Sequence, residues 1–155
     1  MSKPKIETRD ATFDDVVKIA PNIREEDRIE CHLQTGKGIE EAIVESMLAS
    51  SDTWVGTADG EPFFLGGIAC VSPMLGVGAP WMVGTPKIVD VRVPFLRFSC
   101  YYNNRIREAY PILVNYVHAE NEAAVQWLTW LGFEMGEPEP HGPFGAPFRR
   151  FEWRR

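Results

Sequence analysis

Hydrophobic positions follow two different periods along this chain, and the changes of period divide it into strands and helices. Alternating or short apolar runs rich in β-branched and aromatic residues predict strands. These runs lie at residues 5–12, 52–73, 78–85, 111–120 and 142–155. Within the second run, Asp59-Gly60 is a strong turn signal and predicts a hairpin.

Apolar residues spaced three or four apart predict helices between these strands. The helical segments lie at residues 13–20, 24–36, 38–51, 93–110 and 121–131. Thr12 followed by Asp15 resembles a capping box that starts the first helix. Gly36 and Gly132 are expected to end the second and the last, and Pro94 lies near the start of the fourth.

The order of these elements predicts an α/β (α+β) fold built on a mixed central sheet, with helices on both faces. The meander of the N-terminal half continues into a β-α-β-α-β half. The chain of 155 residues has no repeats, low-complexity runs or linker, so residues 1–155 are expected to form a single domain.

Charge and cysteine content exclude several classes of protein. The formal charge of −6 argues against general nucleic-acid binding, and the arginines of "RRFEWRR" are typical of a soluble chain end. The charge is uneven, with seven acids and three bases from Arg24 to Glu45 but five bases and one acid from Lys87 to Arg107. Three widely spaced cysteines fit a reducing compartment and predict neither a disulfide framework nor a zinc site.

The uncharged segment 62–86 is long enough to cross a membrane, but five glycines and two internal prolines interrupt it. Two buried strands joined by a glycine-rich turn explain it better. The start "MSKPKIETRD" has no apolar stretch and is no signal peptide, so we expect a cytoplasmic protein without a membrane span.

The segment "VHAENEAAVQWLTWLGF" resembles a motif of the GNAT acetyltransferase superfamily, in which Asn opens a helix after a strand and Gly-Phe closes it. Here these positions are Asn121, Ala124, Gly132 and Phe133. "GAPWMVGT", followed by a helix, looks like the acetyl-CoA-binding strand of that superfamily. The resemblance implies a GNAT fold, acetyl-CoA as cosubstrate, and N-acetyl transfer to a small-molecule or protein amine. It also allows a homodimer.

Four segments together resemble a narrower family of small phage and prophage proteins, described as GNAT-like or as internal virion proteins of podophages. They are "APNIREEDRIE", "PWMVGT", "NYVHAENEAAVQWLTWLGF" and "HGPFGAPFRRFEWRR". This resemblance implies a phage-encoded protein in the host cytoplasm. It leaves two functions open: an N-acetyltransferase, or a catalytically silent GNAT-fold protein that acts in virion assembly or through contacts with a phage or host protein.

The resemblance places the cofactor along the strand 78–85 and the helix after it. Backbone N–H groups at Met82 and Val83 are the candidates to polarise the thioester carbonyl. Pyrophosphate binding needs positive charge near a helix start. The cofactor-binding candidates are therefore Met82, Val83, Thr85, Lys87, Arg92 and Asn121. For the basic residues, a solvated helix face is an equally good interpretation, and Asn121 is also expected to cap its helix.

Acetyl transfer to an amine also needs a base for the amine and an acid for the departing thiolate. The acids Glu26, Asp27 and Glu30 are candidates for the base, although a solvated acidic helix face explains any one of them. Tyr116 and His118, two apart on one strand, are further candidates for acid or base, with core packing as the alternative. The predicted catalytic set is Glu30, Tyr116 and His118, and no metal site is predicted.

Two departures from the GNAT pattern weaken the catalytic interpretation. The stretch "GTPKIVDVRVPF" lacks the two glycines of the usual pyrophosphate loop. Leu128 stands where many GNAT enzymes place a tyrosine that can protonate the thiolate. Of the two tryptophans on the last helix, at least one of Trp127 and Trp130 is expected in the core, and Trp130 is a candidate to cover an apolar patch.

Overall fold

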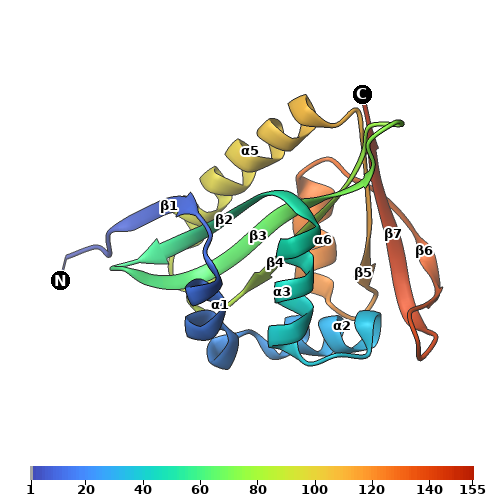
Figure 1. The fold of residues 1–155 in the computed structure, drawn as a ribbon. Helices are drawn as coiled ribbons and strands as arrows, with labels where there is room; N and C mark the ends of the chain where they lie inside the picture. Colours follow the sequence, from blue (N-terminus) through green and yellow to red (C-terminus); the bar gives the residue numbers. More distant parts are fainter. Residues whose placement is uncertain (1) are drawn as a thin grey trace.

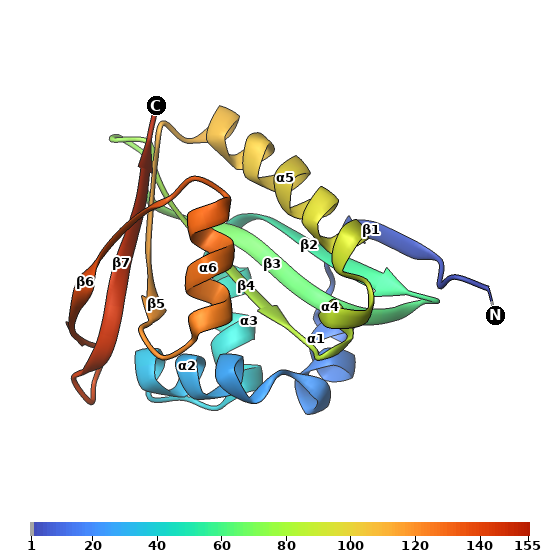
Figure 2. The same ribbon diagram turned by 180° about the vertical axis from the view of Figure 1, so that it is seen from behind.

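A computed structural model describes residues 2–155 and contains one seven-stranded mixed sheet with helices on both faces (Figures 1 and 2). The strand order is β1-β2-β3-β4-β5-β7-β6. The strands are β1 (Ile6–Asp10), β2 (Ser50–Ala58), β3 (Glu61–Ser72), β4 (Val77–Gly84), β5 (Ile112–His118), β6 (Glu134–His141) and β7 (Ala146–Arg154). The predicted fold class is confirmed.

Five of the helices match the predicted segments, whereas the short helices at residues 20–22 and 87–90 were not predicted. The helices are α1 (Phe13–Ile19), the short 3₁₀ helix η1 (Ala20–Asn22), α2 (Glu25–Thr35), α3 (Ile39–Ala49), α4 (Lys87–Asp90), α5 (Arg92–Ala109) and α6 (Glu122–Trp130). The Thr12 N–H donates to the Asp15 carboxylate at 2.8 Å, as a capping box requires. Gly36 ends α2 in the left-handed conformation, with φ of 74°.

The β2–β3 hairpin turns at Asp59-Gly60, where both residues have positive φ (50° and 82°). The uncharged segment 62–86 forms β3 and β4, two antiparallel strands inside the sheet. No helix within residues 2–155 combines the length and the hydropathy needed to cross a bilayer.

The sequence pattern did not predict one of the strands, β6. β6 pairs only with β7, at the edge of the sheet, and its sequence "EMGEPEPH" carries two prolines and three glutamates. Proline cannot donate to a ladder and is confined to edge strands, and charged residues protect such an edge from further pairing. Prolines and charged residues are also typical of loops, so the sequence of β6 did not indicate a strand.

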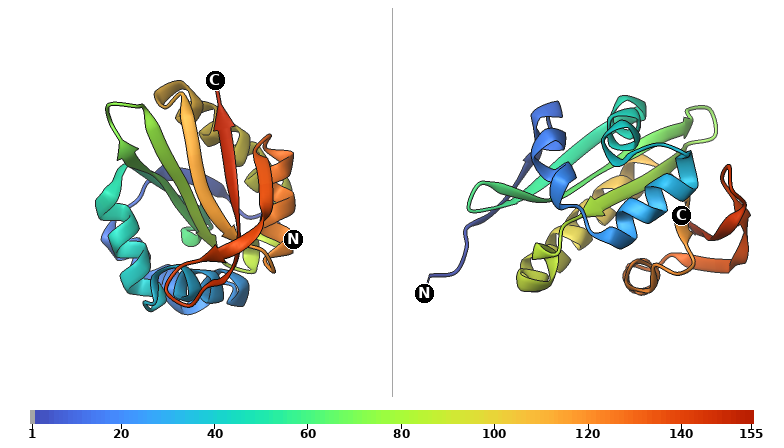
Figure 3. Two further views of the ribbon diagram at one scale, coloured as in Figure 1. Left: turned by 90° about the vertical axis from the view of Figure 1, so that its right-hand side faces the viewer. Right: turned by 90° about the horizontal axis from the view of Figure 1, so that it is seen from below.

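Two apolar cores lie on opposite faces of the sheet. One face is covered by α5 and α6, and its core includes Phe64, Phe95, Leu128, Phe133 and Phe151. The other face is covered by α1 and α3, and its core is built around Ile19, Ile43, Val55, Leu65 and Val83. Figure 3, seen along two further directions, shows α2 crossing the end of the sheet between these two layers.

β4 and β5 pair in parallel over a very short stretch. Only Val77 with Ile112 and Gly78 with Leu113 are in register, after which the strands diverge. Figure 2 shows α6 lying over the divergent part and α2 across its open end. The β-α-β order of this half predicts parallel strands, and the observed pairing confirms it.

Candidate functional site

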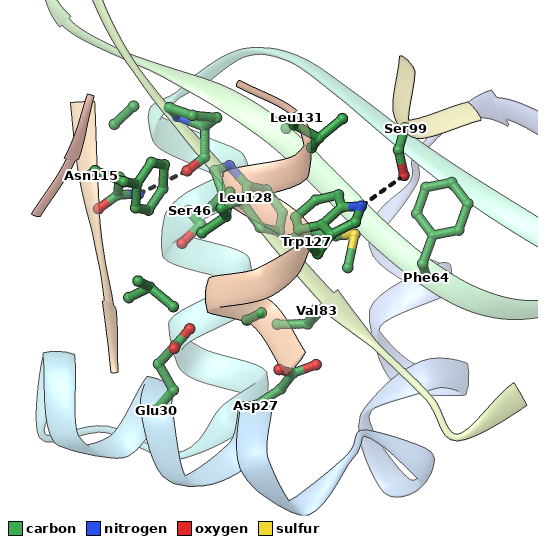
Figure 4. Close-up of a pocket in the computed structure, with 18 of the residues that line it drawn as sticks. Asp27, Glu30, Ser46, Phe64, Val83, Ser99, Asn115, Trp127, Leu128 and Leu131 are labelled. Carbon is green, nitrogen blue, oxygen red and sulfur yellow. Dashed lines mark hydrogen bonds between the residues drawn. The ribbon is translucent and has the colours of Figure 1, made fainter. Parts of the chain in front are cut away.

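The divergence of β4 from β5 produces a cavity of about 880 Å³ that reaches both faces of the sheet. One part is lined by residues of α2 and α3, including Glu30, Gln34 and Ser46. The other part is lined by residues of α5 and α6, including Phe95 and Trp127. Figure 4 shows side chains from both layers pointing into this space. Two reactants that enter from opposite faces could therefore meet between the strands.

Backbone groups of β4 line the gap where β5 has moved away. The Gly84 N–H donates to Asp27 Oδ2 at 3.0 Å, and the Pro80 carbonyl accepts from Asn115 Nδ2 at 2.8 Å. Because backbone polar groups alternate in direction along a strand, the Met82 N–H points to this same side. Val83 pairs with Leu65 of β3, and its N–H points the other way. Of the two predicted oxyanion donors, the geometry thus retains Met82 and disfavours Val83.

A polar cluster joins α2 to the ends of both diverging strands. Glu30 Oε1 accepts from the His118 N–H at 2.8 Å and from Asn121 Nδ2 at 3.4 Å. Asn121 Nδ2 also donates to Asp27 Oδ1 at 3.2 Å. Through Asp27 the cluster reaches Gly84 on β4. Two carboxylates, one amide and two backbone N–H groups therefore hold the open end of the gap.

Burial raises the pKa of both carboxyls in this cluster. Desolvation is the largest cause for Glu30 and raises its pKa from 4.5 to about 7, with the nearby Asp27 charge adding to the effect. The His118 N–H and Asn121 act in the opposite direction. Desolvation also raises the pKa of Asp27, against the Arg24 charge 3.7 Å away. Glu30 is half-buried and lines the cavity, and the protein atoms packed around it cause the desolvation.

Asn121 begins α6, but it does not cap it in the predicted way. Its side chain makes no capping bond to the backbone within the described residues, and its amide is directed at Asp27 and Glu30 instead. The buried Oδ1 finds no hydrogen-bond donor among residues 2–155. The prediction of side-chain capping was wrong because two desolvated carboxylates compete for the amide hydrogens more strongly than one backbone N–H attracts the oxygen.

The three predicted catalytic residues lie at this end of the gap in different settings. Glu30 lines the cavity, and Tyr116 lines it while stacking on His141 with ring centroids 3.8 Å apart. The buried His118 ring packs beside Phe148 at 5.3 Å, and its backbone rather than its imidazole contacts Glu30. Glu26 is exposed and ion-paired with Arg24 at 2.9 Å, as a solvated helix face predicts.

The predicted pyrophosphate residues are spread over the segment after β4. Arg92 is exposed at the start of α5 and lines the cavity. Lys87 is exposed beside Asp90, with Nζ and Oδ2 3.8 Å apart. Thr85 is buried, and its hydroxyl accepts from the Lys87 N–H at 3.3 Å. The structure therefore brings Arg92 to the cavity and leaves Thr85 and Lys87 outside its lining.

The α6 residues separate into packing and surface roles. Leu128 is buried in the core and offers no proton. Trp127 packs against that core, and its Nε1 donates to Ser99 Oγ at 3.1 Å. Trp130 is 56% exposed, so one tryptophan of the two is in the core, as expected. Ser99, Trp81 and Asn115 also line the cavity and were not singled out from the sequence, because no motif distinguishes them there.

The fold is that of the GNAT acetyltransferases. Ard1 from Thermoplasma volcanium matches with a TM-score of 0.76 and 12% identity, over 96% of this chain and 97% of that one. The yncA protein of Salmonella typhimurium, solved with acetyl-CoA, matches with 0.65 and 11%, over 96% and 93%. A GNAT-family acetyltransferase from Streptococcus pneumoniae matches with 0.63 and 14%, over 97% and 99%. No protein-family model and no curated protein sequence matches the chain.

Proposed function

We propose that this protein is an N-acetyltransferase that moves the acetyl group of acetyl-CoA to an amine. One observation carries the proposal: the cavity passes through the sheet between β4 and β5 and reaches both helical layers. Such a passage lets a thioester approach from the α5–α6 face while an amine approaches from the α2–α3 face. The GNAT fold, the Met82 N–H that faces the gap and the buried acids on α2 support the same function.

The residues present fit acetyl-CoA in two respects. The gap offers the backbone N–H of Met82 to a thioester carbonyl. Arg92 supplies positive charge at the cavity and at the start of an 18-residue helix, where a pyrophosphate is favoured. Asn121 Oδ1 has no donor among residues 2–155, but Asn121 is buried outside the cavity lining, so it is a weaker candidate for a pantetheine contact. Lys87, Thr85 and Val83 remain weaker candidates for this role.

Glu30 is proposed as the general base. An attacking amine must lose a proton, and a carboxylate with a pKa of about 7 is ionised for part of the population at neutral pH and still basic enough to accept it. Bound acetyl-CoA supplies the acyl carbon and the thiolate leaving group. With Leu128 in the core, Tyr116 is the hydroxyl that lines the cavity on β5, and we propose it as the acid. His118 would act through its backbone.

Binding of acetyl-CoA is the first test of this function. A ligand that binds only the folded state adds about 2.7 kcal/mol of stability at 100 times its Kd, which is a melting shift of several degrees for a domain of this size. We expect such a shift with acetyl-CoA and CoA, and a smaller one in Arg92→Ala. Arg105→Ala is the matched control, because Arg105 lies on the same helix but pairs with Asp52 at 3.0 Å. No shift at millimolar ligand would refute the proposal.

A non-catalytic role in phage assembly or host contact is the second candidate. The burial of Leu128 and the absence of the two loop glycines favour it. The comparisons give no support to a phage origin, and both the origin and a phage or host partner remain predictions from the sequence. Binding of CoA without transfer to any amine would favour this candidate.

A further inference from the structure

We infer that the acceptor is a small monoamine with a flat apolar body and no carboxylate, of the arylalkylamine type. The inference rests on the proposed acetyl transfer and concerns the part of the cavity lined by α2 and α3. Acidic, aromatic and uncharged polar side chains line this part. They include Asp27, Glu30, Gln34, Glu45, Ser46, Trp81, Asn115 and Tyr116, and they lie beside apolar residues such as Ala42 and Ile43.

The charged groups of this chamber leave one carboxylate free to meet a cation. Asp27 is engaged by Gly84, Asn121 and Arg24. Glu45 forms an ion pair with Lys37 on the surface. Glu30 uses Oε1 for its two bonds, and no residue of the described chain donates to its Oε2. One free carboxylate fits one ammonium group, so a polyamine would leave its other charges without partners.

Among the described residues, the α2–α3 side of this chamber offers no unpaired cationic side chain to hold a carboxylate on the acceptor. Arg24 is its one cationic side chain among the lining residues of α2 and α3, and Arg24 already pairs with Glu26 at 2.9 Å and with Asp27 at 3.7 Å. A zwitterionic amino acid would bring a negative charge close to Asp27 and Glu30. Like charges in a desolvated site repel strongly, so amino acids should be poor acceptors.

Two aromatic side chains stand on the strands that border the gap. Trp81 of β4 packs toward the α1–α3 core and is fixed by a bond from its Nε1 to Ser50 Oγ at 2.8 Å. Tyr116 of β5 is fixed by stacking on His141. Fixed aromatic faces beside a carboxylate suit an ammonium group on an aromatic body, through stacking and cation–π contacts.

The β6–β7 turn packs on α2 next to this chamber, and His141, which precedes the turn, lines the cavity. Gly142 has φ of 79°, and a Cβ there would lie 2.4 Å from the Leu33 carbonyl oxygen. Phe144 packs on His32 at 5.2 Å between ring centroids, and Pro143 lies against Gly36. This packing holds the turn against α2 next to His141, which stacks on Tyr116 in the cavity wall.

A panel of amine acceptors, assayed at saturating acetyl-CoA, tests the inference. CoA release and formation of the acetylated product are measured for each acceptor. The panel contains phenethylamine, tryptamine, spermidine, phenylalanine and a hexapeptide with a free N-terminus. We expect kcat/KM for the two arylalkylamines to exceed that for phenylalanine, spermidine and the peptide by at least about a hundredfold. Comparable turnover of phenylalanine, spermidine or the peptide would overturn the inference and leave the proposed transfer intact.

A variant pair separates recognition from folding. Trp81→Leu removes the aromatic face, and Trp81→Phe keeps a ring while losing the bond to Ser50. For Trp81→Leu we expect KM for tryptamine to rise about fivefold to thirtyfold with the acetyl-CoA melting shift unchanged. Trp81→Phe should stay within about threefold of the wild type. An equal KM in all three proteins, or bound acetyl-CoA without any transfer to the arylalkylamines, would refute the monoamine assignment. Failure to bind acetyl-CoA would instead refute the proposed function.

Discussion

Replacing Glu30 with Gln should lower activity and raise stability, and the stability change should depend on pH. Glu30 is an acid whose folded pKa is raised from 4.5 to about 7, so between these values the folded state holds a proton that the unfolded state has lost. Stability contributed by the neutral acid is therefore present below pH 4.5 and lost as pH rises through 7. Gln keeps the acceptor for the His118 N–H without the buried charge.

The raised pKa sets the size of this effect. The difference between the ordinary pKa of 4.5 and the folded pKa of about 7 corresponds to roughly 3 kcal/mol of cost for ionising Glu30 in the folded protein at pH 8. We expect E30Q to be more stable than the wild type at pH 8 by an amount of this order, and equal to it within about 1 kcal/mol at pH 4.5. Because the charges of Asp27 and Glu30 interact, the difference reports the ionisation of Glu30 together with its effect on Asp27.

Urea unfolding at pH 4.5, 6, 7 and 8 measures the stability difference, and acetyl transfer to a monoamine measures the activity. Loss of the general base should lower kcat by about 10² to 10⁴ and remove the acidic limb of the pH profile near 7. Glu26→Gln is the matched control, since Glu26 lies on the same helix and is exposed. A pH-independent stability difference, or an E30Q enzyme with wild-type kcat, would refute the reasoning.

Three further predictions concern the same region. Asn121→Ala should destabilise the protein by about 1–3 kcal/mol at pH 8 and less at pH 5, because it deprives two buried carboxylates of their shared donor. Urea unfolding at both pH values measures this loss of stability, and a loss that does not depend on pH would contradict the prediction. Gly142→Ala should destabilise the protein more than Gly145→Ala, since both positions need positive φ but only Gly142 would place a Cβ against Leu33. Equal melting temperatures of the two variants would contradict the close packing of the β6–β7 turn on α2. Met82→Pro removes an N–H that faces the gap, so this variant should fold but lose acetyl transfer, while Val83→Pro should disrupt the β3–β4 ladder. Circular dichroism and the transfer assay distinguish the two variants, and full activity in Met82→Pro would exclude the oxyanion role.

The sequence predicted the fold well where local signals agree with tertiary structure. Asp59-Gly60, Gly36 and Thr12 each act through their own backbone conformation or immediate neighbours, and each was placed correctly. β6 was missed because an edge strand is protected by the residue types that otherwise mark loops.

The site could be predicted only in part, because its chemistry arises from long-range contacts. Asn121 was recognised from motif spacing, yet its partners Asp27 and Glu30 lie 94 and 91 positions away. Glu30 was one of several acids on a helix that looked solvated, and only its position under the gap distinguishes it. Trp81 and Asn115 carry no local signal, because their role depends on two strands that diverge.

The most direct test of the central claim is an amide chemical-shift titration of the ¹⁵N-labelled protein with acetyl-CoA. The account predicts saturable shifts for amides that border the gap, above all Met82, Gly84 and Tyr116, together with Arg92 at the start of α5. It predicts unchanged amides in β1 and in the exposed edge strand β6. Absence of shifts at millimolar acetyl-CoA, or shifts confined to residues away from the β4–β5 gap, would contradict it.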